Sequence, residues 1–243
     1  MLKKILLVWI ISVGFIESRG QIISETKQAN SFPLSNAIIY VDDTDHALVK
    51  KAAELLQQDI EMVIGKKPIL INNISAAKAE SIIVIGSIEN SSLIKKLITE
   101  KKINSTAIKG KWEAYRVESI TNPFAGFKNG LIIAGSDRRG TAYGVFEVSK
   151  LIGVSPWYWW ADVPAKKKTN LYINANKFFS DLPKVKYRGI FINDEAPALS
   201  GWTKEKFGGF NHKFYEKVFE LILRLKGNYL WPAMWGNAFY YDD

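Results

Sequence analysis

Two adjacent carboxylates, Asp194 and Glu195, follow an apolar run that is predicted to be a buried strand. Carboxyl groups at the end of a strand can act as a general acid, as a general base, or as ligands for sugar hydroxyls. Successive strand residues point to opposite sides, so a regular strand directs only one of the two into a site, whereas a turn that begins at Pro197 brings both near it. The alternative interpretation is a loop cap or an ion pair with Arg188.

Aromatic and amide side chains accompany these carboxylates and the next predicted strand. Trp231, Trp235 and Asn237 lie on or just after that strand, and Asn193 precedes Asp194. Flat aromatic faces suit the apolar side of a pyranose ring, and amides can bind hydroxyls, although a place in a hydrophobic core explains Tyr229 and one of the tryptophans as well. For the cluster at 157–160, packing against a neighbouring domain is the preferred interpretation.

A β-α-β segment, residues 181–243, is predicted to position these groups. Asn211 is a good N-cap for a helix with apolar residues at 214, 218, 221, 222 and 225, and Gly227 suits the residue that follows the helix. Two parallel strands joined by a helix are typical of the start of a (β/α)8 barrel, in which chemistry occurs at the carboxyl ends of the strands. Trp231 would then lie at the same end as Asp194.

An α/β domain is predicted for residues 36–180. Strands are expected at 37–41, 81–85, 112–120 and 131–134, and helices at 47–64, at 91–100 and within 135–153, with Gly65 and Gly153 ending two of them. Residues 170–174 are expected to be extended. Residues 21–35 are polar and lack periodicity, and are predicted to be a linker.

The first 20 residues have the three parts of a secretory signal: Lys3 and Lys4, an apolar run at 5–16, and small residues before Gln21. The sequence therefore predicts an exported protein, periplasmic or secreted, with no membrane attachment after cleavage. The 243 residues include no cysteine and two histidines without a partner at ligand spacing, so neither disulfides nor a zinc site are expected. No metal and no cofactor is predicted.

The formal charge of +9 lies mainly outside the β-α-β segment, because residues 187–243 carry seven basic and seven acidic side chains. The remaining lysines are scattered and lack the motif or aromatic interleaving that nucleic-acid binding requires. A solvated surface is the simpler interpretation. Weak attraction to an acidic polysaccharide is also compatible with this charge.

The segments combine into a known pattern. IIAGSDRRGTAYGVFEVSKLIGVSPWYWWADVP, YRGIFINDE and GWTKEKFGGFNHKFYEKVFELILRLKGNYLWPAMWGNAF together resemble glycoside hydrolase family 115, the xylan α-1,2-glucuronidases. The resemblance is strong from about residue 131 to the end and less distinct before it. It implies an α/β domain of a sandwich-like kind followed by a (β/α)8 barrel, and an inverting hydrolysis that removes glucuronic acid or its 4-O-methyl ether from acidic xylan.

The resemblance also implies roles. Asp194 and Glu195 become the catalytic candidates, and Asn193, Trp231, Trp235 and Asn237 the substrate-binding candidates. Residues 181–243 correspond to only the beginning of a barrel, so the chain alone is expected to be inactive, and the complete enzyme could form a homodimer. Two alternatives remain open: a non-catalytic carbohydrate-binding or interaction module, and another exo-acting barrel glycosidase such as a hexosaminidase.

Overall fold

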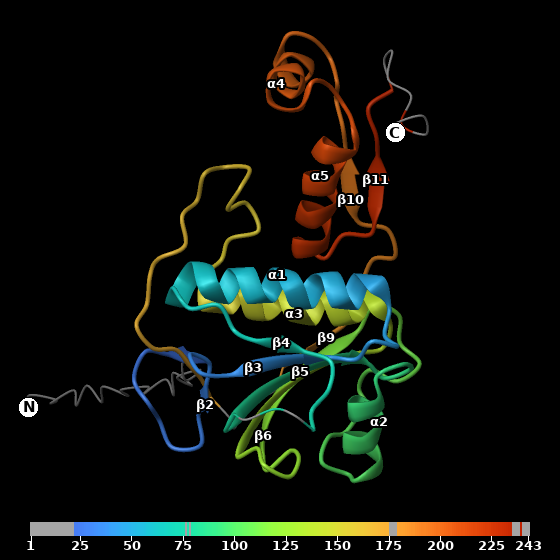
Figure 1. Cartoon of the computed structure of the whole chain (residues 1–243). Helices are drawn as coiled ribbons and strands as arrows, with labels where there is room; N and C mark the ends of the chain where they lie inside the picture. The colour runs from blue at the N-terminus through green and yellow to red at the C-terminus, as the bar shows by residue number, and fades with distance from the viewer. Residues whose placement is uncertain (1–21, 76, 78, 175–178, 235–238, 240–243) are drawn as a thin grey trace, which may run out of the picture.

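The computed structural model describes residues 22–75, 77, 79–174, 179–234 and 239. The predicted signal therefore lies outside the described residues, as do Trp235 and Asn237. Within the described part, no helix combines the length and the apolar character needed to cross a membrane. The chain folds into a layered α/β part and, standing on it, a smaller β-α-β part (Figure 1).

A six-stranded mixed sheet forms the centre of the first part. Its order is β4 (Leu70–Ile71), β3 (Ile38–Val41), β5 (Ser81–Ser87), β7 (Asn129–Gly135), β6 (Tyr115–Thr121) and β9 (Phe179–Asp181). The first four strands are parallel, and β6 runs antiparallel to both β7 and β9. The prediction of an α/β domain is confirmed. The predicted strand at 112–120 begins later, at Tyr115.

Helices cover both faces of this sheet. Helices α1 (Ala47–Ile64) and α3 (Arg138–Ile152) lie on one face, and α2 (Ser92–Thr99) lies on the other (Figure 1). The buried strands β3, β5 and β7 supply apolar side chains to both layers, as parallel strands that are covered on both faces do. Gly65 and Gly153 end α1 and α3 with φ of 80° and 111°, as predicted.

The structure differs from the linker predicted for residues 21–35. Strand β1 (Ile23–Ser24) and strand β2 (Phe32–Pro33) both pair antiparallel with β8 (Tyr172–Ile173) in a small sheet. Phe32 and Leu34 are fully buried in the core beneath α1 and α3. Each of these strands has two residues, which is too few to show a periodicity. Their partner β8 lies far along the chain, so no local pattern indicates the pairing.

The β-α-β part contains β10 (Gly189–Phe191), α4 (Ala198–Phe207), α5 (His212–Arg224) and β11 (Tyr229–Trp231). Strands β10 and β11 are parallel, with Gly189 opposite Tyr229 and Phe191 opposite Trp231. The predicted strand–helix–strand order is confirmed, but α4 is an additional helix that the sequence reasoning missed. Asn211 caps α5 by accepting from two backbone N–H groups. The residue after the helix C-cap is Lys226, with φ of 59°, and not the predicted Gly227.

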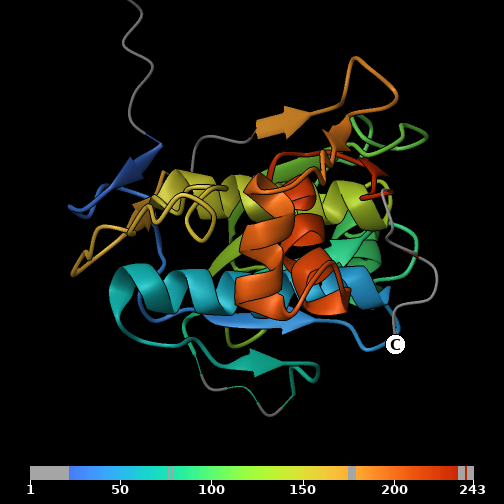
Figure 2. The ribbon, with the colours of Figure 1, turned by 90° about the horizontal axis from the view of Figure 1, so that it is seen from above.

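The β-α-β part rests on α1 and α3 through α5 (Figure 2). Arg224, at the end of α5, donates to both carboxylate oxygens of Asp59 on α1, at 2.9 and 3.0 Å. Its guanidinium lies over the rings of both Phe146 and Tyr158, 4.9 Å from each centroid. Tyr143 on α3 donates to the carbonyl of Gly227 at 2.7 Å. These buried polar contacts fix the position of β10 and β11 relative to the sheet.

Candidate active site

The predicted site residues lie at the carboxyl ends of β10 and β11, which stand side by side (Figure 1). Up to Ile192 the first strand alternates regularly: Ile190 and Ile192 pack in the core formed with α5, whereas Gly189 and Phe191 lie on the open face. The added Cβ of an alanine at 189 would approach the carbonyl oxygen of Tyr229 to 1.9 Å. Glycine is therefore required for the close pairing of these strands.

The two adjacent carboxylates have different environments. Asp194 is 4% exposed, whereas Glu195 and Asn193 are exposed. The backbone N–H of Met234, just beyond β11, donates to Asp194 Oδ2 at 3.1 Å. Because this bond joins the ends of both strands, Asp194 has a fixed position at the junction, and Glu195 is accessible to a ligand.

Arg188 does not pair with either carboxylate, which excludes the alternative ion pair considered for Asp194. Its Nη2 instead donates to Glu113 at 2.6 Å, and its Nε donates to the carbonyl of Lys226 at 2.8 Å. Arg188 lies at the amino end of β10, away from Asp194 along the strand. Arg188 therefore holds the amino end of β10, whereas Asp194 and Glu195 lie at its carboxyl end.

Trp231 lies on the open face of the two strands and is 50% exposed. Its ring contacts Phe191 edge to face, with centroids 5.5 Å apart, and Tyr187 contacts Tyr229 in the same way at 6.4 Å. Tyr229 lies on this open face and is 48% exposed, so a core place for it stays a prediction that depends on the rest of a barrel. The open face thus presents an aromatic surface that leads toward Asn193 and Glu195.

The tryptophan cluster at 157–160 packs largely as predicted. Trp160 contacts Trp202 of α4 and Phe214 of α5, and its Nε1 donates to the carbonyl of Lys217 at 3.3 Å. Trp159 contacts Trp202 and Phe207, whereas Trp157 is 44% exposed. A loop of the first part thereby supports α4, the helix that follows the carboxylates.

Glu113 is a buried carboxylate that the sequence reasoning missed. It accepts hydrogen bonds from Arg139, from Arg188 and from Asn228, so it joins the amino ends of β10 and β11 to the first part. Burial alone would raise the pKa of the Glu113 carboxyl, but these hydrogen bonds outweigh it and the pKa lies below its ordinary value. No sequence pattern connects residues so distant along the chain.

The lowered pKa of Glu113 predicts a pH-dependent stability. A carboxyl group whose pKa is lower in the folded state than in the unfolded state stabilises the fold. This stabilisation is complete above the unfolded-state pKa and is lost as the pH falls through the folded-state pKa. Glu113→Gln should cost about 2 kcal/mol at neutral pH, because two arginines lose a charged acceptor, and less toward about pH 3. Urea unfolding of both proteins across this range measures the difference.

The matched control is Glu80→Gln. Glu80 likewise forms an ion pair, with Lys128 at 2.6 Å, but both side chains are largely exposed and water screens the pair. This variant should change stability far less than Glu113→Gln. A penalty for Glu113→Gln that is the same at every pH would contradict the assigned role.

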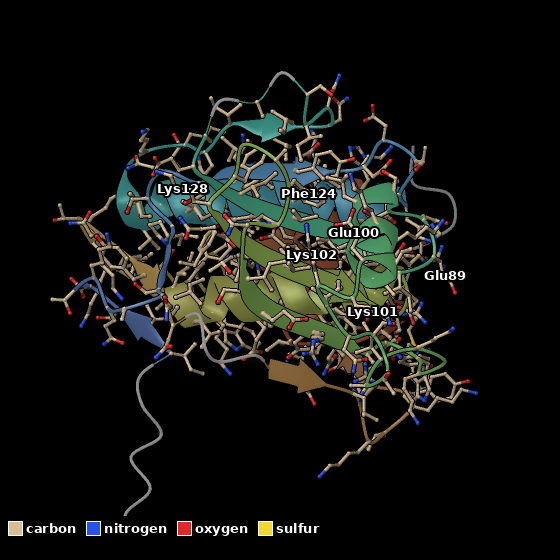
Figure 3. All side chains as sticks on the ribbon, turned by 90° about the horizontal axis from the view of Figure 1, so that it is seen from below. Glu89, Glu100, Lys101, Lys102, Phe124 and Lys128 are labelled. Atoms are coloured by element: carbon tan, nitrogen blue, oxygen red, sulfur yellow. The ribbon has the colours of Figure 1, made fainter. Side chains whose placement is uncertain are left out.

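On the face that carries α2, Lys101, Lys102 and Lys128 are accompanied by Glu89 and Glu100 (Figure 3). Lys102 pairs with Glu100 at 3.0 Å, and Lys96 lies 3.9 Å from the same side chain. This interspersed pattern agrees with a solvated surface.

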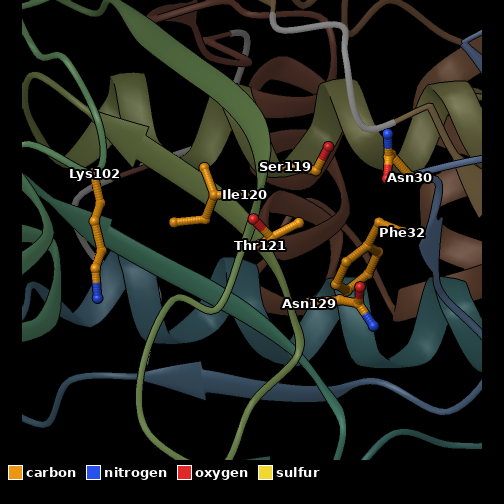
Figure 4. Close-up of a pocket in the computed structure, with 7 residues that line it drawn as sticks. All are labelled: Asn30, Phe32, Lys102, Ser119, Ile120, Thr121 and Asn129. Atoms are coloured by element: carbon orange, nitrogen blue, oxygen red, sulfur yellow. The ribbon is translucent and has the colours of Figure 1, made fainter.

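A hollow of about 540 Å³ lies on the first part of the protein (Figure 4). Neither Asp194 nor Glu195 lines it. Its lining residues are Asn30, Phe32, Lys102, Ser119, Ile120, Thr121 and Asn129. None of them is a carboxylate, so this hollow lacks the acid and base that glycoside hydrolysis requires. The ends of β10 and β11 remain the better candidate site.

Residues 180–243 match the family model described as glycosyl hydrolase family 115. Among solved structures, a family GH115 4-O-methyl-α-glucuronidase, BtGH115A, described as having specificity for decorated arabinogalactans, shares 35% identity and a TM-score of 0.70. The match covers 82% of this chain and 25% of that enzyme, so the chain spans about a quarter of its length. A search of curated proteins gave no significant match.

More distant structural matches include two hexosaminidases. A GH20 β-N-acetylhexosaminidase from Streptomyces coelicolor A3(2) has 12% identity and a TM-score of 0.48, covering 82% of this chain and 31% of its own. An N-acetyl-β-hexosaminidase from Streptomyces plicatus has 12% identity and a TM-score of 0.47, with 82% and 30% covered. These values are too low to bear on function. The sequence match at 180–243 and the structural match over most of the chain agree, and we identify the chain with glycosyl hydrolase family 115.

Proposed function

We propose that the protein, in its complete form, is an α-glucuronidase that removes glucuronic acid or 4-O-methylglucuronic acid side chains from an acidic polysaccharide. The observation that supports this most is the match to BtGH115A at 35% identity. Glucuronoxylan is the proposed substrate from the sequence resemblance. Decorated arabinogalactan is the second candidate, because it is the substrate named for BtGH115A.

The proposed chemistry is an inverting hydrolysis. It requires one carboxyl group as the acid and another as the base for a water molecule, with about 6.5 to 9.5 Å between them. Asp194 and Glu195 are neighbours in the chain, so we do not assign them as the acid and the base together. We assign Asp194 to holding the sugar or the water, and Glu195 is the second candidate among the catalytic residues. A further carboxylate from elsewhere in the enzyme would complete the acid–base pair.

The proposed pocket wall consists of side chains around these carboxylates. Trp231 has an exposed face for the apolar side of a sugar ring, and exposed Asn193 can donate to a hydroxyl. Trp235 and Asn237 follow β11 in the sequence and are proposed for the same wall. We further propose that β10, α5 and β11 begin a (β/α)8 barrel, in which the open aromatic face would point inward.

We also propose that residues 1–20 direct export to the periplasm or the exterior, where plant polysaccharides are encountered. Neither nucleic acid nor a membrane is a proposed partner, and a homodimer is the proposed assembly of the complete enzyme.

The test is an assay of the full-length protein on glucuronoxylan and on glucuronic-acid-decorated arabinogalactan. Chromatography should detect free 4-O-methylglucuronic acid from at least one of them, and proton NMR should show the β-anomer first, as inversion of an α-linkage requires. An aryl N-acetylhexosaminide is the contrasting substrate. Release of N-acetylglucosamine without any uronic acid would reject the proposal.

A further inference from the structure

The end of β11 is held from two sides by side chains. Backbone pairing between the strands ends where Ile192 donates to the carbonyl of Trp231 at 2.9 Å. Pro232 has no N–H to donate. The next two N–H groups are used by side chains: that of Ala233 donates to Tyr215 Oη at 3.1 Å, and that of Met234 donates to Asp194 Oδ2 at 3.1 Å.

These two hydrogen bonds are mechanically connected. Because each peptide unit is planar, only the φ and ψ angles of Ala233 separate the N–H of Ala233 from that of Met234. The hydroxyl that fixes the first N–H therefore restricts the direction of the second, which reaches Asp194. Tyr215, Ala233 and Asp194 are 3%, 2% and 4% exposed, so water does not readily replace either bond.

Tyr215 is itself held in place on a rigid element. It lies in the first turn of α5, where its backbone N–H donates to the carbonyl of the N-cap Asn211 at 3.0 Å. Its ring packs against Phe214, Phe219 and Phe239, with centroids 5.0, 6.1 and 4.6 Å away. A side chain fixed by ring contacts on a capped helix can position a neighbouring loop within the narrow tolerance that a reaction centre needs.

We infer that Tyr215 is a positioning residue: its hydroxyl sets the end of β11 so that the N–H of Met234 holds Asp194 in the geometry that the reaction uses. This inference rests on the proposed function, because it assigns Tyr215 to the reaction of the same site. Tyr215 acts through the backbone of Ala233 and Met234.

The test is Tyr215→Phe in the full-length protein, which removes one oxygen atom and retains the ring. We expect kcat to fall about tenfold, since small misplacement of a reacting group is costly, with KM changed by less than about twofold. Hydrogen exchange measured by mass spectrometry should be about fivefold faster in peptides that contain Ala233 and Met234, because one hydrogen bond is lost. Peptides from α1 and α3 should be unchanged.

Tyr40→Phe is the matched control. Tyr40 on β3 is buried, at 4% exposed, and its hydroxyl donates to Asp42 Oδ2 at 3.2 Å. This substitution also removes one oxygen atom and one buried hydrogen bond, but in the sheet of the first part. It should leave kcat and the exchange near Ala233 as in the wild type. Unchanged exchange in Tyr215→Phe would overturn the inference whatever the activity, as would faster exchange with unaltered kcat, or an equal loss of kcat in Tyr40→Phe.

Failure of the proposed function has a different signature. In that case the wild-type protein itself releases no uronic acid from either polysaccharide. The exchange measurement still decides whether Tyr215 holds the end of β11.

Discussion

Asp194→Asn is expected to lower the release of uronic acid by the full-length protein about 100-fold to 1000-fold, the range associated with a lost acid, base or orienting charge. The amide has nearly the shape of the carboxyl group, and its oxygen can still accept from the N–H of Met234. The substitution therefore removes the charge and the proton-transfer capacity without opening a cavity. Initial rates on the better polysaccharide, together with thermal unfolding, measure both effects.

The control for Asp194→Asn is Glu205→Gln. Glu205 is an exposed carboxylate on α4, the helix that follows Asp194 in the chain, and belongs to the same part of the protein. It should retain the wild-type rate. If Asp194→Asn were as active as this control, Asp194 would be a structural cap and the candidate site would have to be sought elsewhere.

Arg224→Met is expected to destabilise the protein by about 3 to 5 kcal/mol, the cost of leaving a buried charge without its partner. The methionine fills much of the apolar space beside Phe146 and Tyr158, but Asp59, fully buried on α1, loses both of its guanidinium hydrogen bonds. Burial already raises the pKa of Asp59. Urea unfolding at neutral pH measures the loss.

The pH dependence of this variant has a definite sign. Without Arg224, the folded-state pKa of Asp59 lies still further above its unfolded value, so the charged form destabilises the fold at neutral pH. The penalty should decrease as the pH falls and Asp59 becomes protonated. A penalty that grows on acidification would contradict this account.

The double variant Asp59→Leu with Arg224→Met provides the internal control. It removes both charges of the Asp59–Arg224 pair, and buried ion pairs replaced by apolar side chains are often neutral in stability. Glu220, which also accepts from Arg224, still accepts from Tyr158 and lies 3.8 Å from Lys217. Most of the stability lost in Arg224→Met should return. If the stability lost in the double variant equalled the sum of the losses in Asp59→Leu and Arg224→Met, the two side chains would not be coupled. The pair would then not be the interaction that holds α5 against α1.

The two predictions concern opposite ends of the β-α-β part. Asp59 and Glu113 in the first part hold Arg224 and Arg188 at the base of the β-α-β part, whereas Asp194 lies at its opposite end. The parallel strands β10 and β11 connect the two ends. The first part thus supplies a rigid support for the carboxylates.

Several local features could be predicted from the sequence because neighbouring residues decide them. The apolar spacing from 47 to 64 and the following Gly65 determined helix α1 and its end. Ser91 and Asn211 determined the starts of α2 and α5, since a capping side chain needs only the next few backbone N–H groups. The long motifs from residue 131 onward also pointed to glycoside hydrolase family 115.

Other features depended on contacts between distant residues, which no local pattern encodes. The sequence of residues 21–35 predicts a linker, whereas strands β1 and β2 within it form by pairing with β8, far along the chain. Glu113 gave no signal, since its partner Arg188 is 75 positions away. The contact that distinguishes Asp194 from Glu195 is likewise distant, since it comes from Met234, 40 positions away and just beyond β11.

The sequence by itself therefore determined the longer helices and strands and the residue types available for sugar chemistry, because periodicity and capping act over a few residues. Only the tertiary structure decided which carboxylate is held between two strands and which remains accessible. It also decided that Tyr215 and Met234 control that position, because hydrogen-bond partners are selected by the packing of α5 against β11.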